Sequence, residues 1–354
     1  MYRAGIIMLC IVPIALAVWY YQPGESREEA VFPSVQTPTP SPIPAAVTIP
    51  NGTQVFQTFN NCGPAALSMA LSYEGITISQ QELGRILRPY QNPQGDNDDK
   101  SVTLSELARF ATSHNLAVYH RPNGSLQTIK QFIASGIPVI VRTRLKIDDD
   151  IGHFRIIKGY DDATGEFIQD DSLQGKDLKY SYDTMFQLWQ TFGFEYLVIV
   201  SPDSKQTAER ILGDDVDEKT AWQNARSRAQ LHSDQRPADI YARLSLSVAL
   251  YHTGEYAQSV KEFETVQSQL PMRTLWYQIE PILSYIELGE FDNVLSITQN
   301  ILSNQNRAFS ELYLIRGAIY ENRGDKDSAR AEYEKAVLYN SSLEAAKQAL
   351  QSIQ

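Results

Sequence analysis

The pattern of hydrophobic and polar positions divides the chain after residue 50 into helical and extended segments. In the first part of this region, apolar residues recur every three or four positions, as on the buried face of a helix. Two of these segments open with a capping motif, Ser79 to Glu82 and Thr103 to Glu106. The pattern predicts four helices, over residues 65–73, 79–87, 103–111 and 125–135.

The pattern then changes to that of β-strands. Residues 137–141 are apolar with proline at the second position, which is typical of the start of a buried strand. Residues 153–160 and 166–171 flank a turn at 161–165 and predict a hairpin. A last strand is expected over residues 193–200. Because the helices come first and an antiparallel sheet follows, the fold class is α+β.

Beyond residue 203 the pattern is helical and carries an internal repeat. Gly254, Gly289 and Gly324 recur every 35 residues, each between two helical stretches. This spacing resembles the tetratricopeptide repeat, a helix–turn–helix unit of about 34 residues. The sequence therefore predicts an all-α repeat domain at residues 203–354, whose concave face would bind a peptide or a partner protein. An unspecific helical bundle is the alternative.

The first 50 residues contain two segments of a different kind. Residues 5–21 are apolar, with Arg3 before them and a tryptophan–tyrosine cluster at the far end. They predict a membrane-anchoring helix over residues 1–22, with the folded part of the chain extracytoplasmic. Secretion after signal cleavage at Ala15-Leu16-Ala17 is the alternative. Residues 23–50 are rich in proline and predict an extended linker that packs no core.

Charge and composition exclude several classes of function. The 354 residues include 31 lysines and arginines and 42 acids, the net charge is −11, and no segment is basic. The chain therefore lacks the positive surface of a nucleic-acid-binding protein. It has no glycine-rich phosphate loop and no cluster of metal ligands, so no cofactor and no metal are expected. The acidic run at residues 148–150 lacks the alternating spacing of calcium ligands and predicts a solvated loop.

Cys62 is the first candidate for chemistry. The chain has two cysteines, and the other, Cys10, lies in the N-terminal apolar run. Cys62 comes at the start of the first predicted helix, and small residues follow it. A helix N-terminus favours the thiolate, which is how many cysteine nucleophiles are activated. A small buried hydrophobic residue is the alternative interpretation.

The predicted hairpin supplies two further groups. His153 opens its first strand, and Asp170 and Asp171 end its second strand. The two ends of a hairpin with a short turn meet, so the imidazole can reach one of the two carboxylates. Together with Cys62 they predict a cysteine–histidine–acid triad. The histidine would take the thiol proton, and the acid would fix the imidazole tautomer.

Three segments around these residues match a known pattern. They are Gln57-x-x-Asn60-x-Cys62-Gly63-Pro64-Ala65-Ala66, Gly136-Ile137-Pro138-Val139-Ile140-Val141, and Gly152-His153-Phe154 followed by Gly159-Tyr160-Asp161-Asp162. The pattern resembles that of the bacteriocin-processing, double-glycine peptidases of the papain-like superfamily, over roughly residues 51–202. The resemblance implies an α+β papain-like cysteine peptidase domain with Cys62 as nucleophile, His153 as base and Asp171 as third member. Asp170 is the alternative acid.

The resemblance also implies an oxyanion donor upstream of the cysteine. Gln57 is the candidate, together with the Cys62 backbone N–H, and Asn60 or Asn61 could substitute. Ser172 stands where the family usually has proline after the acid. The sequence as a whole predicts an exported, membrane-tethered peptidase that cleaves peptides or proteins and binds a protein partner through its repeats. A catalytically inactive papain-like scaffold and a transamidase on the same triad are the alternatives.

Overall fold

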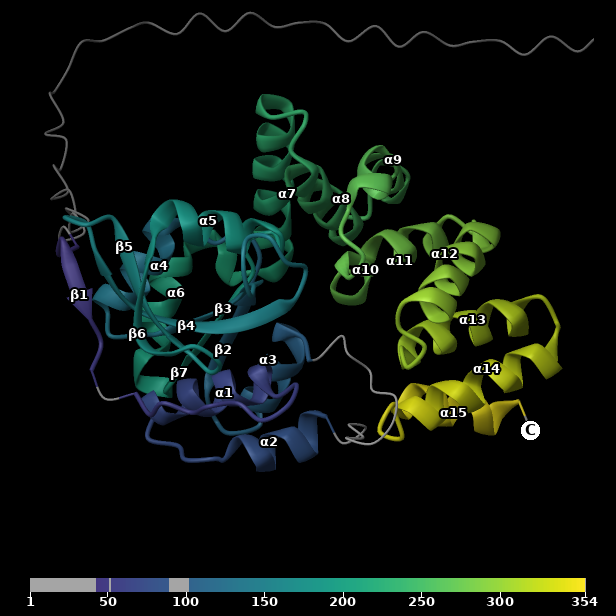
Figure 1. Ribbon diagram of the computed structural model, residues 1–354, viewed down its shortest axis with the longest axis horizontal. Helices are drawn as coiled ribbons and strands as arrows, with labels where there is room; N and C mark the ends of the chain where they lie inside the picture. Colours follow the sequence, from purple (N-terminus) through teal and green to yellow (C-terminus); the bar gives the residue numbers. More distant parts are fainter. Residues whose placement is uncertain (1–42, 51, 89–101, 354) are drawn as a thin grey trace, which may run out of the picture. The chain divides into compact units, whose positions relative to one another are not determined.

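The structure is a computed structural model that describes residues 43–50, 52–88 and 102–353 (Figure 1). Its centre is an antiparallel seven-stranded sheet in the order β2-β7-β3-β4-β5-β6, with β1 paired to β4. The strands are β1 (Ala46–Thr48), β2 (Ala117–Arg121), β3 (Val139–Arg144), β4 (Gly152–Asp161), β5 (Glu166–Asp171), β6 (Gly175–Ser181) and β7 (Tyr196–Val200).

Helices cover both faces of the sheet because the central strands are apolar on both sides. In β3, Ile140 packs in one buried cluster with the helices α1, α2 and α3, while Val139 and Val141 pack in another with α4, α5 and α6. The six helices are α1 (Cys62–Tyr73), α2 (Gln80–Leu87), α3 (Leu104–Thr112), α4 (Leu126–Ala134), α5 (Tyr182–Gln190) and α6 (Lys205–Leu212). The predicted α+β class is confirmed.

The capping motifs fix the starts of α2 and α3. The Ser79 hydroxyl accepts the N–H of Glu82 at 3.2 Å. Thr103 and Glu106 form the full reciprocal box, with bonds of 3.2 Å and 2.7 Å. Helix α1 begins at Cys62, as predicted for the cysteine, and so includes three residues before the segment 65–73 that its apolar pattern indicated.

The predicted hairpin is present as β4 and β5. The turn lies between Asp161 and Glu166, and the register sets Arg155 opposite Asp171. Strand β1 pairs with the end of β4, so close that a Cβ on Gly159 would lie 2.9 Å from the Val47 carbonyl oxygen. Glycine is therefore required there. The predicted linker at residues 23–50 differs from the structure, since its last residues form β1.

Helix α6 belongs to the core of the sheet domain. Ala208 and Leu212 are buried in the same cluster as α4 and α5. Tyr119 on β2 donates to the Glu209 carboxylate at 2.9 Å. Arg121 then donates to the carbonyl groups of the 3₁₀ turn η2 (Gly213–Val216), which follows α6. The hydrophobic core of the sheet domain thus includes residues beyond the predicted boundary at 202/203. The division of the chain into two domains at that point stays a prediction.

The C-terminal region is all-helical, as predicted. Its helices are α7 (Glu218–Gln235), α8 (Ile240–His252), α9 (Tyr256–Val266), α10 (Thr274–Tyr277), α11 (Glu280–Glu287), α12 (Phe291–Asn304), α13 (Ser310–Asn322), α14 (Lys326–Tyr339) and α15 (Glu344–Ser352), with 3₁₀ turns η1 (Pro202–Ser204) and η3 (Gln267–Gln269). Gly254, Gly289 and Gly324 have φ angles of 82°, 73° and 77° and each ends a helix. Only glycine adopts this left-handed turn freely, so the 35-residue period marks helical hairpins. Their assignment as tetratricopeptide repeats stays a prediction.

The predicted localisation is corrected by the structure. Among residues 43–50, 52–88 and 102–353, no helix has the length and apolar character needed to cross a bilayer. The predicted anchor at residues 1–22 lies outside the described residues. This finding contradicts the prediction of a membrane-anchored, extracytoplasmic protein, and neither an anchor nor a location enters the function proposed below.

Candidate active site

Cys62 is the first residue of α1, so its thiol lies at the positive end of the helix dipole. The side chain is buried, with 6% of its surface exposed. Gly63 after it has no room for a side chain, because a Cβ there would lie 2.3 Å from Val102 Cγ2. The small residues next to the cysteine are therefore a packing requirement of the helix start. They hold Cys62 close against the sheet.

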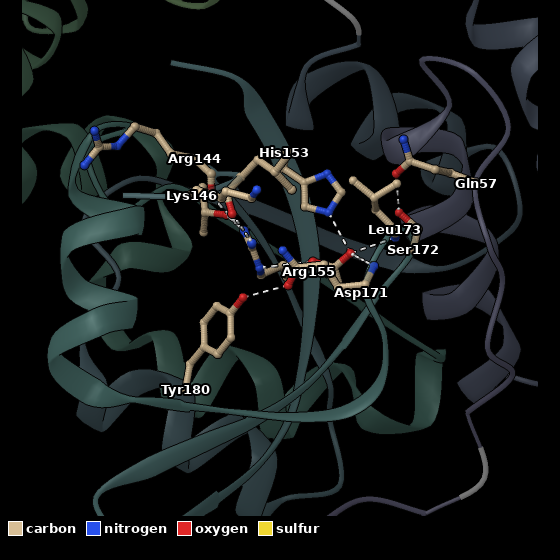
Figure 2. A network of polar contacts seen from close by, with 12 residues as sticks. Gln57, Arg144, Lys146, His153, Arg155, Asp171, Ser172, Leu173 and Tyr180 are labelled. Carbon is tan, nitrogen blue, oxygen red and sulfur yellow. Dashed lines mark hydrogen bonds and ion pairs between the residues drawn. The ribbon is translucent and has the colours of Figure 1, made fainter. Parts of the chain in front are cut away.

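His153 and Asp171 meet across the hairpin, as Figure 2 shows. Side chains two residues apart on a strand share a face, so His153 and Arg155 point the same way. Asp171 lies opposite Arg155 and reaches both. The Nε2 atom of His153 is 2.9 Å from Oδ1 of Asp171, and both side chains are buried. With the carboxylate accepting at Nε2, the imidazole carries its proton there and Nδ1 is left for the thiol.

The Asp171 carboxylate is fixed by several donors. Its Oδ1 atom accepts the backbone N–H groups of Leu173 at 2.7 Å and Gln174 at 2.9 Å, in addition to His153. Burial alone would raise the pKa of Asp171, but the hydrogen bond and charge of His153 and the charge of Arg155 lower it below the ordinary value. The acid is therefore held ionised beside the imidazole.

The imidazole also contacts the thiol. Burial alone would lower the pKa of His153, but hydrogen bonds with Asp171 and Cys62 and the charges of both partners raise it above the ordinary value. A histidine between a thiol and a carboxylate can accept the thiol proton and keep it as an imidazolium. The structure thus brings the three predicted residues together.

Replacing His153 by alanine should slow the alkylation of Cys62 by iodoacetamide more at pH 6 than at pH 9. The raised pKa of His153 keeps the imidazolium, and with it the thiolate, present at neutral and mildly acidic pH. At pH 9 an ordinary thiol ionises without help. Alkylation rates at both pH values check this expectation. An unchanged pH profile would exclude His153 from the site.

Asp170, the alternative acid, points away from His153. The register sets it opposite Ile156, and adjacent strand residues face opposite sides of the sheet. Its Oδ1 atom lies 2.7 Å from Lys158 Nζ and accepts the Asp177 N–H at 3.0 Å. Asp170 therefore forms a buried ion pair on the other face.

Gln57 lies beside Asp171 and is oriented by Ser172. The Ser172 hydroxyl donates to Gln57 Oε1 at 2.8 Å, and the Gln57 N–H donates to the Ser172 carbonyl at the same distance. This contact fixes the amide, with its Nε2 donors directed away from Ser172 (Figure 2). The Asn61 amide instead donates to Thr58 Oγ1 at 2.7 Å, and the Asn60 carbonyl accepts from Arg88. Ser172 stood out in the sequence only because the resembled family usually has proline there, and its contact with Gln57 could not be predicted from that.

Two of the three acids at residues 148–150 have protein partners. Oδ1 of Asp149 accepts the N–H groups of Lys146 at 3.3 Å and Ile151 at 3.2 Å, and Asp150 pairs with Arg273. In the described part of the chain, no three histidine, cysteine or acidic side chains are grouped to hold a metal ion.

Arg155 is the residue next to the triad that sequence reasoning missed. Its guanidinium is fully buried, and its Nε atom lies 3.3 Å from Oδ2 of Asp171. The available signal was a single cation between His153 and Ile157 in a strand that is otherwise apolar at these positions. A charge buried in such a strand needs a counter-ion, and the nearest acids in the predicted hairpin were Asp170 and Asp171.

Comparisons with known proteins match the sheet domain but not the helical region that follows it. Residues 46–197 match the model of the Peptidase_C39 like family. No curated protein matches the chain. A C39-like peptidase from Bacillus anthracis is 17% identical, with a TM-score of 0.38, over 44% of this chain and 98% of its own length.

Two further solved structures are similar over comparable lengths. The peptidase domain of Streptococcus ComA, a bi-functional ABC transporter of a quorum-sensing pathway, is 17% identical over 42% of this chain and 96% of its own, with a TM-score of 0.34. A double glycine motif protease from an AMS/PCAT transporter, in complex with the leader peptide, is 16% identical over 44% and 97%, with a TM-score of 0.33.

Proposed function

We propose that residues 46–197, which match the model of the Peptidase_C39 like family, form an active cysteine peptidase domain that hydrolyses peptide bonds through Cys62, His153 and Asp171. One observation carries the proposal. The His153 imidazole is hydrogen-bonded to Asp171 at 2.9 Å and also to Cys62. This is the arrangement that converts a thiol into a nucleophile and returns the proton to a leaving group.

The reaction would proceed in two acyl-transfer steps. The Cys62 thiolate attacks the carbonyl carbon of the scissile peptide bond, and the C–S bond forms as the carbonyl oxygen takes the negative charge. The C–N bond then breaks, and the leaving amine takes its proton from the His153 imidazolium. In the second step His153 deprotonates water, which attacks the thioester. The C–S bond breaks, the acid product leaves, and Cys62 and His153 return to their starting state.

The oxyanion would be stabilised by Gln57 and the Cys62 backbone N–H. The Cys62 N–H lies at the N-terminus of α1, where backbone N–H groups point out of the end of the helix, and Ser172 holds the Gln57 amide from the carbonyl side. Both donors lie on segments fixed before substrate binds. This preorganisation makes such donors effective in the transition state.

Replacing Gln57 by alanine is therefore expected to lower kcat by about 10²–10³-fold with little change in KM, as for other single oxyanion donors. The oxyanion develops only after attack, so ground-state binding is spared. Steady-state kinetics on a cleaved peptide check the split. Thr53→Ala, an exposed change in the same loop, is the control and should leave both constants unchanged. A rise in KM alone would assign Gln57 to substrate binding.

The proposed substrate is a peptide or a peptide segment of a protein. One similar solved structure, the AMS/PCAT transporter protease, is described as a complex with its leader peptide. We extend only the substrate class to this chain, because its sequence contains no transporter or ATP-binding motif. The helical region at residues 218–353 would bind a protein partner or the remainder of the substrate.

The decisive experiment is covalent labelling of the full chain with a thiol-directed peptidyl electrophile, followed by peptide mapping. The label should be found on Cys62 and should be absent from a Cys62→Ser chain. Product analysis on a peptide library then separates the possible outcomes. A free carboxylate at the new C-terminus supports hydrolysis, and transfer to an added amine indicates a transamidase. Absence of label would favour an inactive papain-like scaffold that recruits partners.

A further inference from the structure

Arg155 occupies an unusual place for a cation. It lies in the middle of β4, two residues after His153, and none of its guanidinium is exposed. Moving an unpaired charge into a protein interior is costly, so such a group is retained only with partners for its donors. The Nη donors of Arg155 have acceptors at the end of β3, and on the other side its charge is paired with the acid of the site, although Nε makes no hydrogen bond in the described structure.

The partners on β3 hold the guanidinium in one orientation. Nη1 donates to the Thr143 hydroxyl and, at 2.9 Å, to the Arg144 carbonyl. Nη2 donates to the Leu145 carbonyl at 2.8 Å. These acceptors belong to β3 and the residue after it, so they are as rigid as the sheet. The guanidinium plane is fixed, and Nε is left facing β5.

The remaining face of the guanidinium meets the carboxylate that binds His153. Nε lies 3.3 Å from Asp171 Oδ2. That oxygen is buried and has no hydrogen bond in the described structure, whereas Oδ1 accepts three. Oδ2 of Asp171 therefore faces the Arg155 guanidinium, and Oδ1 faces the His153 imidazole.

We propose that Arg155 is the positioning residue of this site: it holds Asp171 ionised, with Oδ1 turned toward His153, and thereby raises the fraction of Cys62 present as thiolate at mildly acidic pH. The inference rests on the proposed triad. Arg155 does not touch substrate or the reacting sulfur, and it acts through Asp171. The charged and titratable groups that face it are Asp171 on β5, Tyr180 on β6, His153 on its own strand and Asp149 in the β3–β4 loop.

The geometry calls for arginine rather than for positive charge alone. Nη1 and Nη2 donate to the β3 acceptors, and the same planar group sets Nε 3.3 Å from Asp171 Oδ2 as an ion pair. A lysine ammonium is a single point charge on a flexible stem and cannot span both sets of partners. Arg155→Lys therefore keeps the buried charge while removing the fixed orientation, which separates positioning from electrostatics.

The test is the pH dependence of Cys62 alkylation by iodoacetamide in the full chain. In Arg155→Lys we expect the rate at pH 6 to fall about tenfold, which corresponds to one pKa unit in the thiolate–imidazolium equilibrium. The rate at pH 9 should match wild type. The proton NMR signal of the His153 Nε2–H, strongly deshielded by a charged acceptor, should shift upfield or disappear in the variant.

A second variant tests the same contact with less risk to folding. Thr143→Val keeps the side-chain shape opposite His153 and removes only the hydroxyl that accepts from Arg155. It should show the same pH-selective loss to a smaller extent, about two- to threefold, as expected for one bond among several. Thr164→Val, an exposed change in the β4–β5 turn, is the matched control and should leave the profile unchanged.

The outcomes are distinct. Wild-type rates at both pH values in Arg155→Lys and Thr143→Val would overturn the inference, and so would an equal loss at both pH values, which would indicate a merely structural role. Because alkylation needs no substrate, a chain that cleaves no peptide yet shows the pH-selective loss would overturn only the proposed function. A chain that cleaves peptides but is insensitive to both variants would overturn only the role of Arg155.

Discussion

Replacing Cys62 by serine is expected to abolish peptide cleavage, with a loss of at least about 10⁴-fold in kcat, while the fold is kept. The two side chains differ by one atom, so the buried position at the start of α1 remains filled. A serine hydroxyl is far less acidic than a thiol, and an imidazole built for a thiolate–imidazolium pair does not ionise it. Removing the nucleophile of a triad costs up to about 10⁶-fold in comparable hydrolases.

The measurement is turnover of a peptide identified from a library, together with thermal unfolding of both chains. Cys10→Ser is the matched control, because Cys10 is the only other cysteine. It should retain full activity and the full labelling stoichiometry. If Cys62→Ser keeps more than a trace of activity and unfolds at the wild-type temperature, the nucleophile lies elsewhere and the proposed function fails.

The second large effect is expected from the two neighbouring acids, which should respond in opposite ways. Asp171→Asn should lower kcat by about 10²–10⁴-fold, since the amide removes the charge that orients and stabilises the His153 imidazolium. Asp170→Asn should change kcat less than about threefold, because the Asp170 carboxylate points away from His153 and pairs with Lys158 on the other face of the sheet. It should instead lower the free energy of unfolding, by up to about 3 kcal/mol, because that pair is buried.

Kinetics and chemical denaturation of the two variants check this contrast. Lys158 keeps a second partner, Asp177, at 2.6 Å, so the Asp170 variant should remain folded at room temperature. Equal losses of kcat from the two changes would show that the acid of the site is not assigned by the β4–β5 register. The proposed mechanism would then lose its third member.

The hairpin that carries the site could be predicted because its signals are local. The apolar run after His153, the turn at residues 161–165 and the returning run to Asp171 fix its strands without knowledge of the rest of the chain. The choice between Asp170 and Asp171 could not be made in the same way. It depends on the register, and the register includes an irregularity between Ile157 and Gly159 that no residue pattern indicates.

Some elements that the sequence did not predict form for reasons that lie outside their own residues. Strand β1 has three residues within a proline-rich segment. It forms because it pairs with the last residues of β4, which β3 does not reach. In strand β6 only Leu178 and Tyr180 are half-buried, and the exposed residues around them are polar, so the apolar alternation is limited to two positions and gives a weak signal. The contact of Arg155 with β3 and β5 likewise joins residues from three strands, and only the assembled sheet brings them together.

The position of α6 determines at which residue the sheet domain could be joined to a different C-terminal region. A join placed at the end of the family match, at residue 197, or at residue 202, would leave behind Ala208 and Leu212 and expose the apolar surface that they cover. A join after Val216 retains α6 and the carbonyl groups that Arg121 binds. It also falls directly before Asp217, whose carboxylate caps α7 at 2.8 Å. Of the three joins, the one between Val216 and Asp217 would therefore disturb the core of the sheet domain least.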